Sequence, residues 1–258
     1  VERSRGLGDV YKRQGMQTVY LKACLNGVRR KDQHPAIPCT PTEIAEDAAA
    51  CRDAGAAAVH VHAKDAHGFD SLLASTVDPV VAAIRARCPG LPVGVTTGAW
   101  ALPDPAARCA AIDAWTELPD FASVNWHEDG AVEVAETLLA RGIGVEAGLW
   151  NEAAALLWSG SPLRRECFRV LLELPGGVAG SEVEEQAVRM LAQVRVGCAL
   201  DVLLHGEDSS AWPVLDLAAA RGVGARIGLE DTLRLPDGSL AANNTELVAA
   251  GSVRIGIR

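Results

Sequence analysis

Residues 40–62, TPTEIAEDAAACRDAGAAAVHVH, hold the pattern that decides the fold. Thr40 is a suitable helix cap, Pro41 suits the first helical position, and Glu43 completes a capping box. The Ala-rich stretch that follows stops at Gly55, a residue type that commonly ends helices. Residues 57–62 then form a short apolar run, which is typical of a buried strand. This stretch therefore predicts one helix followed by one buried strand.

The same alternation extends to both sides of this stretch. Strands are predicted at 19–24, 57–62, 92–97, 121–125, 144–149, 167–174, 200–205 and 225–229. Helices are predicted at 41–54, 77–88, 106–115, 132–141, 153–158, 182–194, 211–221 and 243–250. Strand–helix units of about 30 residues imply a parallel sheet, and eight of them close a barrel. No G-x-G-x-x-G follows the first strand, which argues against an open doubly wound sheet. We predict an α/β fold of the (β/α)₈, or TIM-barrel, type.

Length and composition limit the classes of function. A chain of 258 residues with 49% hydrophobic content suits one barrel domain. The net charge of −9 argues against nucleic acid as a partner, and no apolar run reaches the length of a membrane helix. Seven scattered cysteines without a C-x-x-C spacing indicate reduced thiols and hence a cytoplasmic protein.

The two ends of the sequence are unusual. Residues 9–14, DVYKRQ, match the translation of a transposase-based sequencing adaptor. We therefore interpret residues 1–15 as read-through rather than native sequence, with a natural leader as the alternative, and residues 16–258 as a single catalytic domain. Residues 251–258, GSVRIGIR, interrupt a helical pattern, so the last helix is expected to end near residue 250.

A pair of histidines ends the second predicted strand. His60 and His62 are two residues apart, so both imidazoles point to one face of the strand, about 7 Å apart along the backbone. This spacing suits two nitrogen ligands on one divalent metal, and barrel active sites lie at the carboxyl ends of the strands. The alternative is a pair of hydrogen-bonded core histidines.

A third metal ligand is predicted at the end of the eighth strand, in residues 226–231, RIGLED. Strands two and eight are both even-numbered, and alternate strands contribute to the same layer of a barrel interior. Glu230 could therefore approach both histidines, and a His₂Glu set leaves coordination positions open, as a catalytic metal requires. The alternative is a carboxylate at the N-terminus of a helix.

Several motifs together resemble the β-keto acid cleavage enzymes, a family that includes 3-keto-5-aminohexanoate cleavage enzymes. The motifs are residues 25–27 (LNG), 34–45 (HPAIPCTPTEIA), 54–65 (AGAAAVHVHAKD), 96–98 (TTG), 123–126 (SVNW), 145–146 (VE) and 226–231 (RIGLED). They occur in order from Met16 to about residue 250. The resemblance implies a (β/α)₈ barrel, a zinc ion held by His60, His62 and Glu230, and a homo-oligomer, with a tetramer favoured.

The resemblance also implies the reaction, in which a 3-keto acid and acetyl-CoA give acetoacetate and a new acyl-CoA. The metal would stabilise negative charge on the keto oxygen. Asp231 would be the base, held ionised by Arg226, because a nearby cation favours a carboxylate. Glu146 resembles a second acid or base of the family.

Further positions are implied as substrate-binding residues. Thr96 or Thr97 and Ser123 correspond to donors for the substrate carboxylate and the developing oxyanion, although strand-end hydroxyls often satisfy loop amides instead. Asn125 and His205 also end predicted strands at this face. Trp126 and Trp150 could wall the pocket, whereas His34 and His67 lie in polar loops and are expected to be exposed.

Two residues depart from the family pattern. Arg29 replaces a Glu that contacts the substrate in some relatives, which favours a keto acid with a neutral or anionic tail. Lys64 replaces an Arg that many relatives have, so a planar contact becomes a point charge. Arg29, Arg30, Lys31 and Lys64 are candidates for the phosphates of CoA, with solvated loop cations as the alternative.

Other functions remain open on the same barrel, because fold alone does not determine the reaction. A metal-dependent hydrolase or an aldolase-type lyase would use the metal without CoA. A non-catalytic metal-binding barrel is a further alternative. The Arg226–Asp231 pair argues against it, since metal binding alone does not require this pair.

Overall fold

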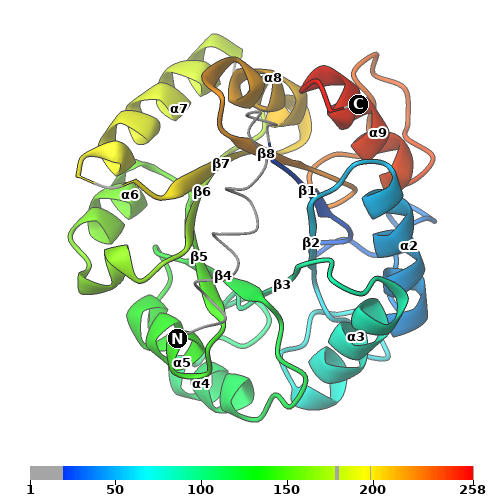
Figure 1. Cartoon of the computed structure of the whole chain (residues 1–258), viewed down its shortest axis with the longest axis vertical. Coiled ribbons are helices and arrows are strands. Elements are labelled where there is room, and N and C mark those ends of the chain that lie inside the picture. Colours follow the sequence, from blue (N-terminus) through cyan, green and yellow to red (C-terminus); the bar gives the residue numbers. More distant parts are fainter. Residues whose placement is uncertain (1–19, 178–179, 198, 258) are drawn as a thin grey trace.

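The computed structural model describes residues 20–177, 180–197 and 199–257. Eight parallel strands form a closed barrel in the order β1 to β8, and helices surround it as an outer ring (Figure 1). The strands are β1 (Leu21–Cys24), β2 (Ala58–Val61), β3 (Val93–Thr96), β4 (Phe121–Asn125), β5 (Gly144–Leu149), β6 (Arg169–Leu174), β7 (Asp201–Gly206) and β8 (Gly224–Ile227). The predicted TIM barrel is confirmed.

The helices alternate with the strands as expected. They are α2 (Pro41–Asp53), α3 (Ala74–Arg87), α4 (Pro105–Asp113), α5 (Ala131–Ala140), α6 (Glu152–Ser159), α7 (Gly180–Arg195), α8 (Ala211–Arg221) and α9 (Asn244–Arg254), with short 3-10 turns η1 (Pro162–Arg165) and η2 (Asp208–Ser210). The capping box of α2 is present: the Thr40 side chain accepts from the Glu43 amide at 3.2 Å, and Glu43 accepts from the Thr40 amide at 3.0 Å. Local sequence thus determines where α2 begins.

The barrel interior is unusually polar. Branched aliphatic side chains fill most such barrels. Here Lys22, Glu146 and Arg169 meet in the interior, with Glu146 accepting from Lys22 Nζ and, at 2.7 Å, from Arg169 Nε. Burying charges is costly unless they are paired. Here the charges are paired, because Glu146 forms ion pairs with both Lys22 and Arg169.

The last helix is longer than predicted. α9 continues to Arg254, so the expectation that residues 251–258 interrupt the helix is wrong as far as Arg254. Gly251 lies so close to β8 that an added Cβ would be 3.1 Å from Ile227 Cγ2, and Ser252 Oγ donates to the Ala54 carbonyl at 2.8 Å. The small residues therefore allow α9 to pack closely against the barrel and against α2, its neighbour in the outer ring (Figure 1).

His34 is buried, and the expectation that it is exposed is wrong. Its Nε2 lies 2.9 Å from the Ala241 carbonyl, and its Nδ1 accepts from the Ala36 amide at 3.2 Å. The imidazole thereby joins the loop after β1 to the loop before α9, two segments that are distant in sequence. His67 is exposed, as predicted.

Asn244, at the start of α9, supports the segment that leads to Glu230. Its Oδ1 accepts from the Leu229 amide at 2.6 Å, and its Nδ2 donates to the Leu25 carbonyl at 2.7 Å and to Asp47 Oδ2 at 2.6 Å. The side chain is fully buried. One amide therefore joins the ends of β1 and β8 to α2.

Asp47 makes stability depend on pH. Burial, only partly offset by the Asn244 hydrogen bond, raises the pKa of Asp47 from 3.8 to about 6. A raised carboxyl pKa stabilises the fold below pH 4 relative to higher pH, and this contribution is lost as the pH rises through about 6. The shift corresponds to about 3 kcal/mol, reduced to about 1–2 kcal/mol because part of the side chain meets water. We therefore expect Asp47→Asn to be more stable than the parent at pH 8, with little difference at pH 4.

Urea unfolding at the two pH values measures this difference. The matched control is Asp53→Asn, which changes an exposed carboxyl on the same helix. An Asp47→Asn difference that stays the same between pH 4 and pH 8 would contradict the interpretation.

One sequence expectation concerns residues outside the described ranges. Residues 1–15, interpreted as read-through, are not among the described residues, and that interpretation stays a prediction. Among the helices of the described ranges, none is both long enough and apolar enough to cross a membrane.

Candidate active site and metal centre

A cavity of about 330 Å³ opens at the carboxyl ends of the strands. Its walls include His60 and His62 from β2 and the loop after it, Arg226 from β8, and Glu230 from the segment after β8. Carboxyl-end cavities of this kind hold the active sites of (β/α)₈ enzymes. The position predicted for the site is therefore the position of the cavity.

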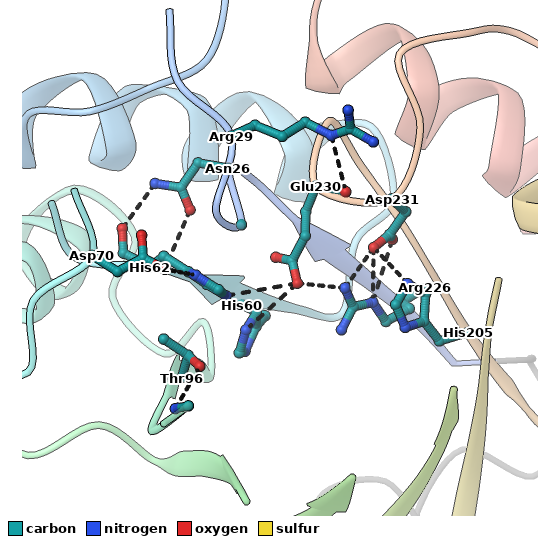
Figure 2. A network of polar contacts seen from close by, with 12 residues as sticks. Asn26, Arg29, His60, His62, Asp70, Thr96, His205, Arg226, Glu230 and Asp231 are labelled. Carbon is teal, nitrogen blue, oxygen red and sulfur yellow. Dashed lines mark hydrogen bonds and ion pairs between the residues drawn. The ribbon is translucent and has the colours of Figure 1, made fainter. Parts of the chain in front are cut away.

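His60, His62 and Glu230 come together in this cavity. Glu230 Oε1 lies 3.9 Å from His60 Nε2 and 3.7 Å from His62 Nε2, and one ligand atom from each residue lies within 4.8 Å of the others. Figure 2 shows both imidazoles directed at this carboxylate. Two ligands at tetrahedral positions, each about 2.1 Å from one ion, are roughly 3.4 Å apart. These three side chains could hold one divalent metal ion with little movement.

The protonation states of these residues also suit a metal. Burial lowers the pKa of His60 to about 3, although Glu230 opposes the shift, so the imidazole is neutral as a ligand must be. Burial would raise the pKa of Glu230, but the Arg226 guanidinium beside it holds it well below its usual range. The buried Oε2 of Glu230 has no hydrogen-bond partner among the described residues. A neutral imidazole at His60 and an ionised carboxylate with a free oxygen at Glu230 fit a zinc-type site.

The Leu25-Asn26-Gly27 motif shapes this site. Asn26 Oδ1 accepts from the His62 amide at 2.8 Å, and its Nδ2 donates to the His62 carbonyl at 2.9 Å. Gly27 has φ +54°, and a Cβ there would lie 2.4 Å from Glu230 Cγ. Asn26 thus fixes the backbone of one candidate ligand, while Gly27 leaves the space that the other occupies.

Asp70 was not anticipated from the sequence. Its Oδ2 lies 2.7 Å from His62 Nδ1 and accepts from Trp100 Nε1 at 2.8 Å, and its Oδ1 pairs with Lys64 Nζ at 2.5 Å. Lys64 also donates to the Gly27 carbonyl, and its side chain is buried. The sequence did not single out Asp70, because its partners His62 and Trp100 lie 8 and 30 residues away and no motif joins the three.

Asp231 lies in a second cluster of charges beside the first. Arg226 Nη2 donates to Asp231 Oδ1 at 2.5 Å and to Glu230 Oε1 at 2.5 Å, so one guanidinium joins the two carboxylates. His205 Nε2 lies 3.0 Å from Asp231 Oδ1, although it is not aligned for a hydrogen bond. The predicted Arg226–Asp231 pair is therefore present.

The charges of this cluster follow from burial and pairing. Burial would raise the pKa of Asp231, but Arg226 and His205 lower it, so Asp231 is ionised. Burial and Arg226 would lower the pKa of His205, but Asp231 and Glu173 outweigh them and raise it to about 9. His205 Nδ1 lies 2.9 Å from Glu173 Oε2. At neutral pH the cluster combines an ionised carboxylate with two cations at the cavity wall.

Glu173 was also missed, although a signal for it exists. It stands in the apolar run of β6, two residues after Leu171 and four after Arg169, so the three share the inward face. A charged residue at an inward position of a barrel strand could have been singled out. The same reasoning identifies Lys22 on β1 and Arg169.

The predicted substrate-binding residues divide between the cavity and its surroundings. The cavity lining includes Thr96, Ser123, Asn125, Arg29 and His205. Thr97 is not part of this lining: it is buried, and its Oγ1 donates to the Ser123 carbonyl at 2.7 Å. Successive strand residues face opposite sides, so Thr96 and Thr97 cannot both face the cavity.

Glu146 lies outside the cavity lining. It is the third residue of β5, and its side chain is fully buried. Burial would raise the pKa of Glu146, but Lys22 and Arg169 lower it to about 2. The carboxylate is thus held ionised by two cations, and its predicted role as an acid or base stays a prediction.

Two tryptophans form the aromatic walls. Trp150 lines the cavity, as predicted, and its Nε1 donates to Asn125 Oδ1 at 3.0 Å. The other wall is Trp100, from the loop after β3, whereas Trp126 is buried and is not part of the lining. Trp100 stacks on His62 with ring centroids 5.8 Å apart and planes 16° apart.

The candidate cations for CoA differ in their surroundings. Arg29 lies at the cavity and pairs with Asp208 at 2.7 Å. Arg30 pairs with Asp32 at 2.8 Å and Lys31 pairs with Glu43, both at the surface. Lys64 is neither exposed nor solvated, so its buried side chain is a poor candidate for a CoA phosphate.

Comparisons with known proteins find relatives that are similar over most of the chain. A protein from Fusobacterium nucleatum subsp. nucleatum named 3-keto-5-aminohexanoate cleavage enzyme is 25% identical over 249 residues, which cover 90% of this chain and 89% of that protein. A protein of the same name from Acetoanaerobium sticklandii is 22% identical over 249 residues, covering 90% of each.

A solved structure described as apo ObcA is similar in fold, with a TM-score of 0.66 and 18% identity. The match covers 83% of this chain and 61% of the ObcA chain, which is longer. The family model described as beta-keto acid cleavage enzyme matches residues 18–255, nearly the whole length. The chain therefore belongs to the beta-keto acid cleavage enzyme family.

Proposed function

We propose that this enzyme uses acetyl-CoA to cleave a short 3-keto acid, with a zinc ion held by His60, His62 and Glu230. The observation that carries the proposal is the Arg226 side chain, which joins Glu230 to Asp231 at the cavity. One guanidinium thereby places a candidate metal ligand and a candidate base side by side. A site that only stored metal would not need the second carboxylate.

The proposed reaction breaks one carbon–carbon bond and transfers two acyl groups. The base takes a proton from C2 of the 3-keto acid, and the C2 carbanion attacks the thioester carbonyl of acetyl-CoA. The CoA thiolate leaves and then attacks the C3 carbonyl of the original keto acid. The C2–C3 bond breaks, C2 regains a proton, and the products are acetoacetate and an acyl-CoA made from the rest of the substrate.

The residues of the chain have separate roles in this proposal. A bound zinc ion would supply Lewis-acid stabilisation of developing negative charge on oxygen. Arg226 keeps Asp231 ionised and oriented, as a base requires. Thr96 and Ser123 face the cavity, where their hydroxyls can donate to the substrate carboxylate. His205 adds a second cation beside the base.

Asp231 needs one local movement to act as the base. Its side chain is fully buried and contacts Arg226 and His205, which both line the cavity. Catalytic contacts are often incomplete before substrate binds. We expect the substrate carboxylate to draw Arg226 or His205 toward itself, and this would open Asp231 to C2 of the substrate.

Glu146 has a supporting role in the proposal. Its two ion pairs leave little capacity for proton transfer, and it neutralises positive charge from Lys22 and Arg169 beneath His60. Without it, two buried cations would raise the cost of placing a metal ion nearby. We therefore assign Glu146 no proton-transfer step.

Arg29 supports a substrate preference. It lies at the cavity, where its Nε donates to the Glu230 carbonyl at 3.3 Å and its Nη2 pairs with the exposed Asp208. A cation at this place disfavours a cationic substrate tail. We propose a neutral or anionic tail, which agrees with the departure of Arg29 from the Glu of some relatives.

The second candidate function is a metal-dependent hydrolase or an aldolase-type lyase. The same His₂Glu set with open coordination positions could serve either reaction without CoA. Dependence on acetyl-CoA therefore separates the candidates.

The deciding experiment uses the zinc-loaded protein and matched 3-keto acids with cationic, neutral and anionic tails, each with and without acetyl-CoA. We expect acetoacetate only when keto acid and acetyl-CoA are both present, and the lowest kcat/KM for the cationic substrate. Loss of keto acid without acetyl-CoA would favour the hydrolase or lyase. A preference for the cationic substrate would overturn the role of Arg29 alone.

Assembly and location also belong to the proposal. The family resemblance supports a homo-oligomer, with a tetramer favoured, and the scattered cysteines support a cytoplasmic location. Light scattering coupled to gel filtration gives the mass of the assembly directly, and a monomer would contradict this part.

A further inference from the structure

We propose that Asp70 is a positioning residue that joins the metal site to the aromatic wall of the cavity: one carboxylate oxygen orients His62 and holds Trp100. This inference rests on the metal site of the proposed function. It concerns Asp70 and Trp100, which are not among the candidate metal ligands. Figure 2 shows the Asp70 carboxylate beside the His62 ring.

The first step is the orientation of His62. Asp70 Oδ2 lies 2.7 Å from His62 Nδ1, while His62 Nε2 lies 3.7 Å from Glu230 Oε1. An ionised carboxylate can only accept, so the proton of the neutral imidazole lies on Nδ1. Nε2 then presents its lone pair to the metal position. Carboxylates that orient metal-binding histidines in this way commonly change metal affinity by 10–100-fold.

The second step is the shared oxygen. Trp100 Nε1 donates to the same Oδ2 at 2.8 Å, and the indole stacks on the His62 ring. The Trp100 ring also packs directly on Gly98, since a Cβ added at Gly98 would lie 2.2 Å from the ring. Because His62 and Trp100 share one acceptor oxygen, a shift in the position or protonation of the His62 ring should alter the hydrogen bond of the Trp100 indole.

The third step is that an amide cannot replace this carboxylate. All three side-chain partners of Asp70 are donors: His62 and Trp100 on Oδ2, and Lys64 on Oδ1. An asparagine would place its NH₂ group against a donor in either orientation. Asp70→Asn should therefore free the His62 ring even though the side chain keeps its size.

The test begins with metal-free protein. We expect nitrogen NMR of the histidine rings to show the His62 proton on Nδ1 in the parent, and a mixture of tautomers in Asp70→Asn. Competition with a chromophoric chelator should then show zinc binding that is 10–100-fold weaker in Asp70→Asn. Glu207→Gln is the matched control, since Glu207 lines the cavity and, among the described residues, forms no hydrogen bond or ion pair with His62. Its zinc affinity should match the parent.

A second variant deals with folding, because Asp70→Asn leaves Lys64 buried without its carboxylate. The double variant Lys64→Met, Asp70→Asn removes the unpaired charge and should show the same loss of zinc affinity. Zinc addition should also change the intrinsic fluorescence of the parent. That change should disappear in Trp100→Phe and persist in Trp150→Phe, where the indole donates to Asn125 instead.

The outcomes separate this inference from the proposed function. A His62 proton on Nε2 in the metal-free parent, or unchanged zinc affinity in both Asp70 variants, would overturn the positioning role even if acyl transfer is observed. Zinc affinity that falls as expected, together with no acetoacetate from any keto acid, would overturn the proposed reaction and leave the role of Asp70 intact.

Discussion

Asp231→Asn is expected to reduce kcat for acetoacetate formation by about 100- to 10,000-fold, the range that general acid–base groups contribute. Metal binding should remain within a few-fold of the parent. Asn keeps the size of the side chain and removes its capacity to take a proton. Because Arg226 and His205 keep Asp231 ionised, the parent carboxylate is in the basic form at neutral pH.

The most direct readout is exchange at C2. In D₂O without acetyl-CoA, the zinc-loaded parent should speed deuterium uptake at C2 of the keto acid, and Asp231→Asn should not. Exchange is the first half-step of the proposed reaction, so it reports on the base alone. An undiminished exchange rate in Asp231→Asn would show that another group takes the proton.

A matched variant controls for the loss of buried charge. Glu173→Gln removes the other carboxylate that contacts His205, yet Glu173 does not contact Arg226 in the described residues. Removing one partner of a buried ion pair can cost about 3–5 kcal/mol of stability. The stabilities of Asp231→Asn and Glu173→Gln are therefore first compared by thermal unfolding. A smaller kinetic loss in Glu173→Gln at similar stability would assign the proton transfer to Asp231.

Glu230→Gln is expected to weaken zinc binding by more than about 100-fold, beyond the effect of an outer-shell residue, and to abolish acetoacetate formation at stoichiometric zinc. The carboxylate contributes the negative charge of the candidate ligand set, since His60 and His62 bind as neutral imidazoles. An amide oxygen offers a weaker ligand and no charge. Removal of zinc from the parent by a chelator should have the same effect on activity.

Excess zinc distinguishes a weakened site from a damaged one. A high zinc concentration should restore part of the activity of Glu230→Gln, because the histidines remain. Glu207→Gln again serves as the control, with parent-like zinc affinity expected. Parent-like zinc binding by Glu230→Gln would mean that the metal ligands are a different set.

The sequence by itself determined the barrel and the main residues of the site. Thr40 and Glu43 start α2 through hydrogen bonds within four residues. The second strand was recognised from the short apolar run at residues 57–62. The H-x-H pair was found because strand geometry places residues i and i+2 on one face, whereas the roles of Arg226 and Asp231 were implied by the family resemblance. Such patterns depend on contacts that are local in the chain.

Only the tertiary structure decided which residues complete the site. Asp70 meets His62 from its own loop and Trp100 from the loop after β3, and Glu173 on β6 meets His205 on β7. The burial of His34 under Ala241 and the close packing of Gly251 on β8 likewise depend on segments that are far apart in sequence. No periodicity or spacing encodes such pairs, because closure of the barrel is what brings β1 beside β8 and the loops onto one face.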